Sequence, residues 1–309
     1  MKRLVFLLAL LLTGCDDSPS VAESKPPVSL PNEGVLRQTA EFSGENAYIH
    51  CHHICALGPR PSGSEAYQAQ LGYLRKHLAA AGWHVTPRSF SLTNGVSMTN
   101  LHATFGEQET TRPIIITCHI DTKIGIGPNF VGADDGASAA AAMLELARIL
   151  STTPEQASQV ELIFFDGEES FAPRMTEHDG LYGSRYEVQR RRNTLPRYQI
   201  NLDMVGARNK TIAIPLMDTD VVMLQEYEKA IAELGFSERR WTVHHGSYMD
   251  DHTPFLEAGV HSLNLITDFL RGGWWHTEKD AMDRICPNSL RESGEMTLQL
   301  IRQLTAKTE

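Results

Sequence analysis

Hydrophobic residues recur with two different periods, and segments of the two kinds alternate along most of the chain. Helical spacing covers residues 35–57 and 64–81, with a dense group of glycines and prolines between them. Strand patterns are found at 84–92, 98–105, 114–119, 160–165, 198–204, 211–214 and 261–266, and further helical patterns at 137–150, 181–192, 219–234 and 287–304. Strands that alternate with helices predict a three-layer α/β/α sandwich with a mostly parallel mixed sheet.

The first residues of the chain do not follow this pattern. They contain Lys2-Arg3, an apolar run over residues 4–12 that is too short to span a membrane, and the sequence Leu-Thr-Gly-Cys ending at Cys15. This ending resembles the bacterial lipobox, so we expect a lipoprotein signal peptide over residues 1–14 and lipidation of Cys15. An ordinary cleaved signal peptide is the alternative. The interpretation implies a lipid-anchored protein of the bacterial cell envelope that faces the periplasm or the cell exterior.

The segment after the cysteine, residues 15–34, is polar and rich in proline, with almost no aromatic content. Such a composition cannot bury a core and predicts a disordered tether. One catalytic domain over residues 35–309 then remains. Asp16 resembles a retention signal for the inner membrane, but the choice between inner and outer membrane stays open.

The charge and cysteine content narrow the range of partners. The net charge is −10 over 309 residues, and loss of Lys2 and Arg3 with the signal peptide takes it to −12. Because the chain has no basic block, we do not expect nucleic acid as a partner.

The cysteines are a separate feature. An exported protein could pair some of its remaining cysteines in disulfides, and the pairing stays open. These cysteines are Cys51, Cys55, Cys118 and Cys286. The run CHHIC also fits a metal cluster, which we disfavour because no second cluster with ligand spacing accompanies it.

The chemistry is concentrated around residues 113–142, PIIITCHIDTKIGIGPNFVGADDGASAAAA. A buried strand ends here at His119, with Asp121 two residues later. A glycine-rich loop then leads to Asp134 and Asp135, directly before a predicted helix. Polar groups that gather where strands end and helices begin are typical of a metal or catalytic centre in an open α/β sheet.

Acidic and histidine residues recur at other predicted strand ends, and together they form a candidate metal site. Their carboxylates and imidazoles are the ligands that zinc uses in catalytic sites. The set is His119, Asp134, Glu168, Glu169, Asp203 and His276. Neighbouring side chains of an extended backbone point to opposite sides, so one glutamate of the pair can bind metal while the other faces the substrate. That second glutamate would have a raised pKa and could carry a proton.

Several other residues fit around such a site. Asp121 could hold the imidazole of His119 in one tautomer, and Asp250 could accept a hydrogen bond from a substrate. Trp274 and Trp275, directly before His276, offer flat apolar area for a small ligand. His244 and His245 lack such neighbours, and we interpret them as surface or loop residues.

An ordered set of motifs now resembles a known family, the zinc-dependent peptidase family M28 and, more closely, its glutaminyl cyclase branch. The resemblance covers roughly residues 35–305. The motifs are CHIDTK, FVGADDGAS with MLELAR, IFFDGEE, LYGSR, NLDMVGA, DDHTPFLEAGV and WHTEKDAMDRI. It implies a fold like that of the zinc exopeptidases, and it implies peptide N-termini as substrates.

The resemblance also implies roles for individual residues. Zinc would be bound by Asp134, Glu169 and His276, with Glu168 as the proton shuttle. Asp203 and Asp250 would form an acidic hydrogen-bonding pair beside the substrate, and Trp275 would orient its carbonyl group. The aminopeptidases of the family hold a second zinc, whose ligands here would be His119, Asp134 and Asp203. Because all these ligands are present, the sequence leaves one zinc and two zincs open.

Three functions follow as alternatives. The favoured one is a glutaminyl-peptide cyclotransferase, because the insert after the glutamate pair, the DDHTPFL motif and the tryptophan before His276 match that branch. A dinuclear zinc aminopeptidase is the second. A lipid-anchored binding or scaffold protein is disfavoured, because no ligand position is missing. The chain departs from the animal cyclases at Arg174, where they have tryptophan, and at Asn264, where they have histidine, so the pocket is expected to differ there.

Overall fold

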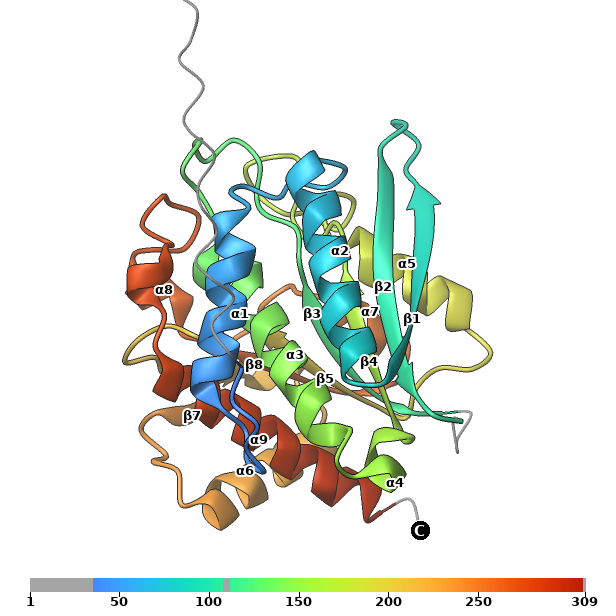
Figure 1. Ribbon diagram of the computed structural model, residues 1–309, viewed down its shortest axis with the longest axis vertical. Helices are drawn as coiled ribbons and strands as arrows, with labels where there is room; N and C mark the ends of the chain where they lie inside the picture. The colour runs from blue at the N-terminus through green and yellow to red at the C-terminus, as the bar shows by residue number, and fades with distance from the viewer. Residues whose placement is uncertain (1–35, 108–111, 308–309) are drawn as a thin grey trace, which may run out of the picture.

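A computed structural model of the protein describes residues 36–107 and 112–307; the predicted signal peptide, Cys15 and the tether lie outside these ranges. At its centre is a six-stranded sheet with the strand order β1-β2-β4-β3-β5-β8 (Figure 1). The strands are β1 (Trp83–Ser91), β2 (Ser97–Phe105), β3 (Ile114–His119), β4 (Val160–Phe165), β5 (Tyr198–Asp203) and β8 (His261–Ile266). β4, β3, β5 and β8 are parallel, and β2 runs antiparallel to both of its neighbours. The predicted mixed, mostly parallel sheet is therefore confirmed.

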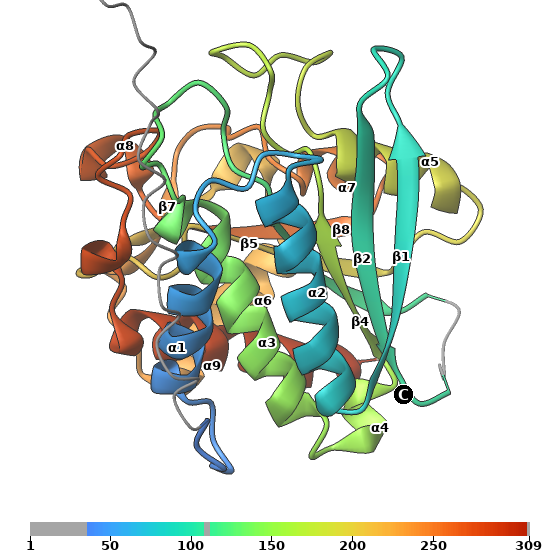
Figure 2. The same ribbon diagram turned by 45° about the horizontal axis from the view of Figure 1, so that its top comes forward.

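Helices cover both faces of this sheet. They are α1 (Gly44–Ala56), α2 (Glu65–Ala80), α3 (Ala139–Leu150), α4 (Pro154–Ala157), α5 (Tyr182–Arg191), α6 (Val221–Leu234), α7 (Thr253–Glu257), α8 (Phe269–Gly272) and α9 (Pro287–Thr305). The helices α1, α2, α3 and α9 pack on one face, while α5 and α7 lie on the other (Figure 2). The predicted three-layer sandwich is confirmed.

Burial explains why the central strands were recognisable as apolar runs. Every residue of β3, β4 and β5 is buried, as expected for parallel strands that are covered on both faces. The larger core lies under α1, α2, α3 and α9. A smaller core on the opposite face joins Ile115, Ile163 and Phe165 of the sheet to Phe255 of α7.

Some elements differ from the sequence-based expectation. The first helix begins at Gly44 and not near residue 35, because Ser43 caps it: the Ser43 hydroxyl accepts a hydrogen bond from the Asn46 N–H at 3.2 Å. The short strand β7 (Trp241–His244), which pairs with β6 (Ile212–Pro215), was not predicted. Neither were the short helices α4, α7 and α8, nor the single turns η1 (Ala133–Ser138), η2 (Leu216–Asp218) and η3 (Met282–Arg284).

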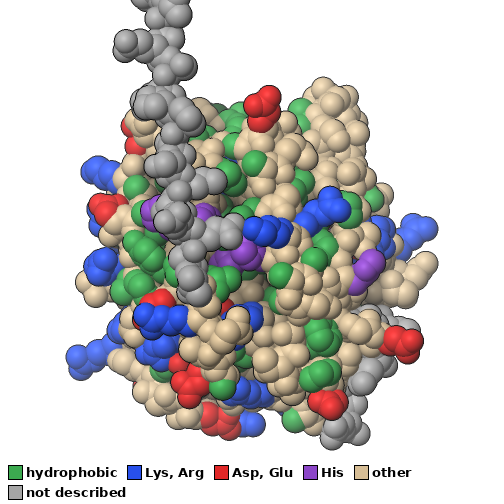
Figure 3. Space-filling model, in the orientation of Figure 1, with side chains coloured by type: hydrophobic (Ala, Val, Ile, Leu, Met, Phe, Trp, Pro, Cys, Tyr) green, Lys and Arg blue, Asp and Glu red, His purple; other side chains and the backbone are tan. Residues whose placement is uncertain are grey.

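The helices α1 and α2 are joined by a cluster of rings. Figure 3 shows one face of the molecule, on which several histidines gather near the middle and acidic and basic side chains are interspersed. The His50 and His77 ring centroids are 4.8 Å apart, and the Tyr73 hydroxyl lies 2.8 Å from the His50 Nδ1. Burial, together with the nearby His77 and His53, lowers the pKa of His50 to about 3. His50 is therefore neutral and serves packing.

The cysteines in the described ranges, Cys51, Cys55, Cys118 and Cys286, are all free. Cys51 and Cys55 are one turn apart in the buried face of α1, and neither belongs to a group that could hold a metal in that part of the chain. Among the described helices, none combines the length and the apolar character needed to cross a bilayer.

Candidate active site

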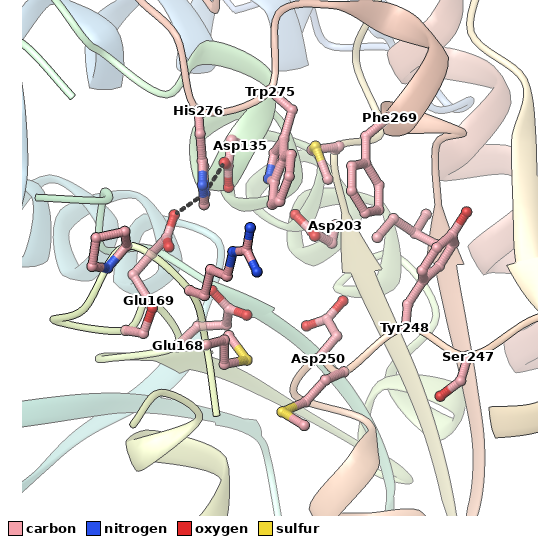
Figure 4. A pocket seen from close by; sticks show the side chains of 17 residues that line it. Asp135, Glu168, Glu169, Asp203, Ser247, Tyr248, Asp250, Phe269, Trp275 and His276 are labelled. Atoms are coloured by element: carbon pink, nitrogen blue, oxygen red, sulfur yellow. Dashed lines mark hydrogen bonds and ion pairs between the residues drawn. The ribbon is translucent and has the colours of Figure 1, made fainter. Parts of the chain in front are cut away.

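Two groups of side chains at one edge of the sheet are arranged so that each could hold a metal ion. The first group is Asp135, Glu169 and His276, and the second is His119, Asp135 and Asp203; within each, the ligand atoms lie within 4.8 Å of one another. They gather there because β3, β4, β5 and β8 are parallel and their carboxyl ends meet at this edge. Figure 4 shows His276, Asp135 and Glu169 pointing toward one another.

Asp135 belongs to both groups and presents one carboxylate oxygen to each. Its Oδ1 lies 3.1 Å from the His119 Nε2, and its Oδ2 lies 3.4 Å from the His276 Nε2. His276 Nε2 also lies 3.1 Å from Glu169 Oε1, and His119 Nε2 lies 3.3 Å from Asp203 Oδ1. The predicted partners Glu169, His276, His119 and Asp203 are thus brought together around Asp135.

The assignment of Asp134 as the metal ligand requires a correction. The Asp134 side chain is fully buried away from both groups, and its Oδ1 accepts a hydrogen bond from the Gly206 N–H at 2.8 Å. The reason is the turn Ala133–Ser138, in which Asp135 has φ −81° and ψ 93° and Gly136 has φ 93°. This backbone turns the two adjacent carboxylates in different directions. The doublet itself marked the right segment, but nothing in it distinguished the two residues.

The backbone of each acidic pair is held by one further carboxylate. Asp280 accepts hydrogen bonds from the N–H groups of Asp134 at 2.7 Å and of Asp135 at 3.0 Å. Asp121 does the same for Glu168 and Glu169, at 3.2 Å each. Asp121 Oδ1 also lies 3.6 Å from the His119 Nδ1, so the same carboxylate faces that imidazole in addition to its backbone contacts. Asp280 was not singled out in the sequence, although it lies within WHTEKDAMDRI.

Both carboxylates of the glutamate pair are shifted toward their neutral forms, since burial raises the pKa of each. At Glu168, burial and then the charge of Glu169 raise the pKa well above its usual value. Burial followed by the charge of Asp250 raises the pKa of Asp203 to about 7. For Asp135, burial acts in the same direction, but the hydrogen bond and charge of His119 outweigh it and lower the pKa. Among the candidate ligands Asp135, Glu169 and Asp203, Asp135 is thus the carboxylate whose pKa is lowered, which favours the anionic form that a metal requires.

A cavity of about 300 Å³ opens beside the first group. It is lined by Glu168, Asp203, Asp250, Trp275, Arg174, Tyr248 and Phe269, among others. Trp275 is 39% exposed, and its ring stacks on the His276 ring at 4.2 Å between centroids. The predicted substrate-binding residues Trp275 and Asp250 thus lie at the cavity. Trp274 does not: it is buried and lines a different cavity. This corrects the sequence-based assignment, because adjacent residues leave the loop after α8 in different directions.

Of the two departures noted in the sequence, Arg174 lines this cavity and Asn264 is buried behind the lining residue Asp250. Asn264 Nδ2 donates a hydrogen bond to Asp250 Oδ2 at 2.7 Å, so the amide fixes the orientation of that carboxylate. Arg174 is an exposed residue of the cavity lining. It lies in the predicted loop after the glutamate pair, whose start is held by Lys123: the Lys123 Nζ donates to Ser170 O at 2.5 Å and to Ala172 O at 2.8 Å. Lys123 was also not singled out in the sequence.

The donor atoms are suited to a zinc ion. Two carboxylates and one imidazole form a set typical of catalytic zinc, and the cavity leaves an open position for substrate. The site also contains two buried carboxylate oxygens with no hydrogen-bond partner among the described residues, Asp135 Oδ2 and Asp203 Oδ1. Because buried polar atoms are normally paired, these atoms indicate a missing ligand of positive charge.

Comparison with known proteins agrees with this site. The pattern of peptidase family M28 matches residues 100–301, and the chain belongs to this family. It is 33% identical over 300 residues to the glutaminyl-peptide cyclotransferase of Boiga dendrophila, a match that covers 83% of this chain and 80% of the relative. These findings confirm the predicted resemblance to the glutaminyl cyclase branch.

Other similar proteins include a second glutaminyl cyclase and an aminopeptidase. The structure of the glutaminyl cyclase of Porphyromonas gingivalis superimposes with a TM-score of 0.76 at 25% identity, covering 85% of this chain and 99% of that one. Aminopeptidase YwaD of Bacillus subtilis (strain 168) is 29% identical over 206 residues, which is 63% of this chain and 41% of that protein. Both reactions therefore occur among the proteins that this chain resembles.

Proposed function

We propose that this protein is a zinc-dependent glutaminyl-peptide cyclotransferase, which converts the N-terminal glutamine of peptides to pyroglutamate and releases ammonia. The observation that carries the proposal is the position of Glu168, a buried carboxylate with a raised pKa that lines the cavity beside Asp135, Glu169 and His276. Two of the named relatives are glutaminyl cyclases, and they support the same reaction.

Asp135, Glu169 and His276 would hold the zinc ion. When bound there, zinc supplies a Lewis acid for the side-chain amide carbonyl of the substrate. Glu168 accepts a proton from the α-amine, whose nitrogen forms a bond to the Cδ carbon of the same glutamine. The bond between Cδ and the amide nitrogen then breaks, and Glu168 gives the proton to that nitrogen, which leaves as ammonia. No water is consumed, and Glu168 ends in the same unprotonated form in which it began.

The remaining cavity residues fix the bent conformation of the glutamine. The nucleophile and the electrophile belong to one residue, so the enzyme needs to hold one conformer and not to bring two molecules together. Asp203 and Asp250 can accept hydrogen bonds from the α-amine, and the Asn264 amide keeps Asp250 in place. The exposed Trp275 covers the ring as it closes.

A dinuclear zinc aminopeptidase is the second candidate, and one observation favours it. The group of His119, Asp135 and Asp203 is complete, and Asp135 presents a separate oxygen to each group. Two ions held by these two groups would suit the activation of water for peptide hydrolysis.

A single comparison tests the two candidates. The purified protein is incubated with a peptide that begins with glutamine and with the same peptide beginning with leucine, and zinc per chain is measured by mass spectrometry. Ammonia from the first peptide, no free leucine from the second and about one zinc per chain support the cyclase. Free leucine with two zincs per chain supports the aminopeptidase and overturns the cyclase.

We further propose that Cys15 carries a lipid that anchors the protein in the bacterial cell envelope. The support is the Leu-Thr-Gly-Cys sequence after the apolar run, followed by the proline-rich residues 16–34. In cells fed a radioactive fatty acid, the wild type is expected to be labelled and to sediment with membranes. Cys15→Ser should lose both properties, and a labelled or membrane-bound Cys15→Ser variant would contradict the anchor.

A further inference from the structure

A second cavity lies on the other side of α8 from the active-site cavity. Its volume is about 690 Å³, against about 300 Å³ for the active site. Phe269 of α8 lines the active-site cavity, whereas Arg271 and Gly272 of the same helix line the second one. The two tryptophans that follow divide in the same way, with Trp275 at the first cavity and Trp274 at the second. The two cavities therefore share a wall that is one short helix thick.

Positive charge is concentrated in the second cavity. The exposed arginines Arg208, Arg239 and Arg271 line it, together with two histidines and the buried Lys210. Asp268 is the single acidic residue among its described lining residues. Asp268 Oδ2 pairs with Arg271 Nε at 3.2 Å. Within the described ranges, no acidic side chain forms an ion pair with Arg208 or Arg239. In a chain with a net charge of −10, this cavity is a local concentration of positive charge.

The active-site cavity has the opposite balance. Carboxylates dominate its lining, namely Asp135, Glu168, Glu169, Asp203 and Asp250, and Arg174 is the single Lys or Arg among the described lining residues. A peptide whose N-terminal amine enters this acidic cavity can place negative side chains in the basic one. A peptide with positive side chains would meet repulsion in the second cavity.

The wall between the cavities suits a peptide chain that passes over it. Trp275, which lines the active-site cavity, is 39% exposed, and Leu270 of α8 is 63% exposed, so α8 and the loop after it carry exposed apolar area. The wall is also well packed, because the rings of Phe269 and Trp275 lie 4.7 Å apart and those of Phe269 and Tyr248 lie 5.0 Å apart. A helix with its side chains is about 10 Å wide, and an extended chain covers that distance in about three residues.

We propose that the second cavity is an anion subsite that binds carboxylate side chains of the peptide substrate, about four to six residues after the N-terminal glutamine. The inference rests on the proposed cyclase function for the identity of the first residue. It names the substrate class as acidic peptides. The charges act on binding and not on the chemical step. The preference for acidic peptides should therefore lower KM and leave kcat unchanged.

The experiment uses the zinc-loaded protein and the peptides Gln-Gly-Ala-Gly-Glu-Glu-Ala and Gln-Gly-Ala-Gly-Lys-Lys-Ala, whose charged side chains lie four and five residues after the glutamine. The test variant combines Arg208→Gln, Arg239→Gln and Arg271→Gln. The matched control combines Arg75→Gln, Arg192→Gln and Arg302→Gln, which removes the same charge from exposed positions elsewhere. In wild type and control, the acidic peptide is expected to have a kcat/KM about tenfold higher at low salt, and this ratio falls as salt screens the charges. In the test variant the ratio should fall toward one.

Two further measurements keep the outcomes separate. Calorimetric binding of the acidic peptide to the zinc-loaded Glu168→Gln enzyme does not depend on turnover. If the wild type releases no ammonia but this binding still weakens when the three arginines are replaced, the cyclase function fails and the subsite stands. A ratio near one in the wild type, or an equal fall of the ratio in the control, overturns the subsite. Binding of free phosphate to the arginines, with the two peptides still equivalent, would overturn it as well.

Discussion

The two acidic pairs of the site, Asp134-Asp135 and Glu168-Glu169, look equivalent in the sequence and are used differently in the structure. In each pair, one residue, Asp135 or Glu169, belongs to the group that includes His276. In each pair, a single further carboxylate, Asp280 or Asp121, accepts hydrogen bonds from both backbone N–H groups. The other residue differs. Asp134 is turned into the interior, where it binds the Gly206 N–H, while Glu168 faces the cavity. In the proposed mechanism, one pair would thus supply a ligand and a structural contact, and the other a ligand and a proton carrier.

The difference shows that the surroundings of each side chain assign its role. Asp134 has a backbone N–H opposite it and no access to substrate. Glu168 has an open cavity opposite it and a charged neighbour that raises its pKa. The four positions can therefore be separated by experiments that measure zinc, turnover and stability independently.

The largest effect is expected for the two ligands. Asp135→Asn and Glu169→Gln should each lose zinc on desalting, because a neutral amide is a poor replacement for an anionic ligand. Loss of Lewis-acid assistance of several kcal/mol lowers turnover by about 10³-fold or more. Zinc per chain and ammonia release are the measurements. Asp134→Asn is the matched control and should keep its zinc; the opposite result for Asp134 and Asp135 would restore the original assignment.

A smaller loss, without loss of metal, is expected at Glu168. Glu168→Gln removes the proton carrier and should lower kcat by about 10²- to 10⁴-fold, the usual contribution of general acid-base catalysis. Zinc per chain should equal that of the wild type, which Glu169→Gln should not achieve. A Glu168→Gln enzyme with normal turnover would refute the role.

The carboxylates that hold the backbone should have intermediate effects. Asp280→Asn leaves one oxygen acceptor for the N–H groups of Asp134 and Asp135, and Asp121→Asn does the same at the glutamate pair. Residues that orient metal ligands typically contribute about 10- to 100-fold in metal affinity. Zinc dissociation constants from chelator competition test this. Unchanged affinity in both variants would show that the turns keep their shape without these contacts.

The smallest effect is expected at Asp134. Asp134→Ala removes the acceptor of the Gly206 N–H and leaves that buried group unpaired, which should lower the free energy of unfolding by about 1–3 kcal/mol. Urea unfolding of the zinc-free protein measures this change without a contribution from bound metal. Asp134→Asn can still accept that hydrogen bond and should lie closer to the wild type. Equal stability of Asp134→Ala and the wild type would contradict the structural role.

The difference between the two acidic pairs also shows what the sequence could not predict. The bounds of β4 and β8 were predicted to the residue, because buried parallel strands are apolar runs between polar or turn residues. The order of strands and helices and the segments that carry the site were also recognisable. The sequence did not reveal which residue of an adjacent acidic pair faces the site. The directions of the two side chains depend on local backbone angles, such as the φ of 93° at Gly136.

Trp274 and Trp275 illustrate the same limit, since they line different cavities although they are neighbours in the sequence. The short strand β7 and the helix α8 escaped prediction because four residues carry too little periodicity. Asp280 and Asp121 have their effect through backbone N–H groups, and such contacts leave no pattern in the sequence.

The carboxylate of Asp135, with one oxygen directed at His119 and the other at His276, has a thermodynamic consequence. Ions held by the two groups would not bind independently, since both would share the carboxylate of Asp135. By linkage, the factor by which the first ion alters the affinity for the second would equal the factor in the reverse direction. Zinc held by both groups would therefore follow one coupled equilibrium, in which the number of ions per chain depends on the free zinc concentration.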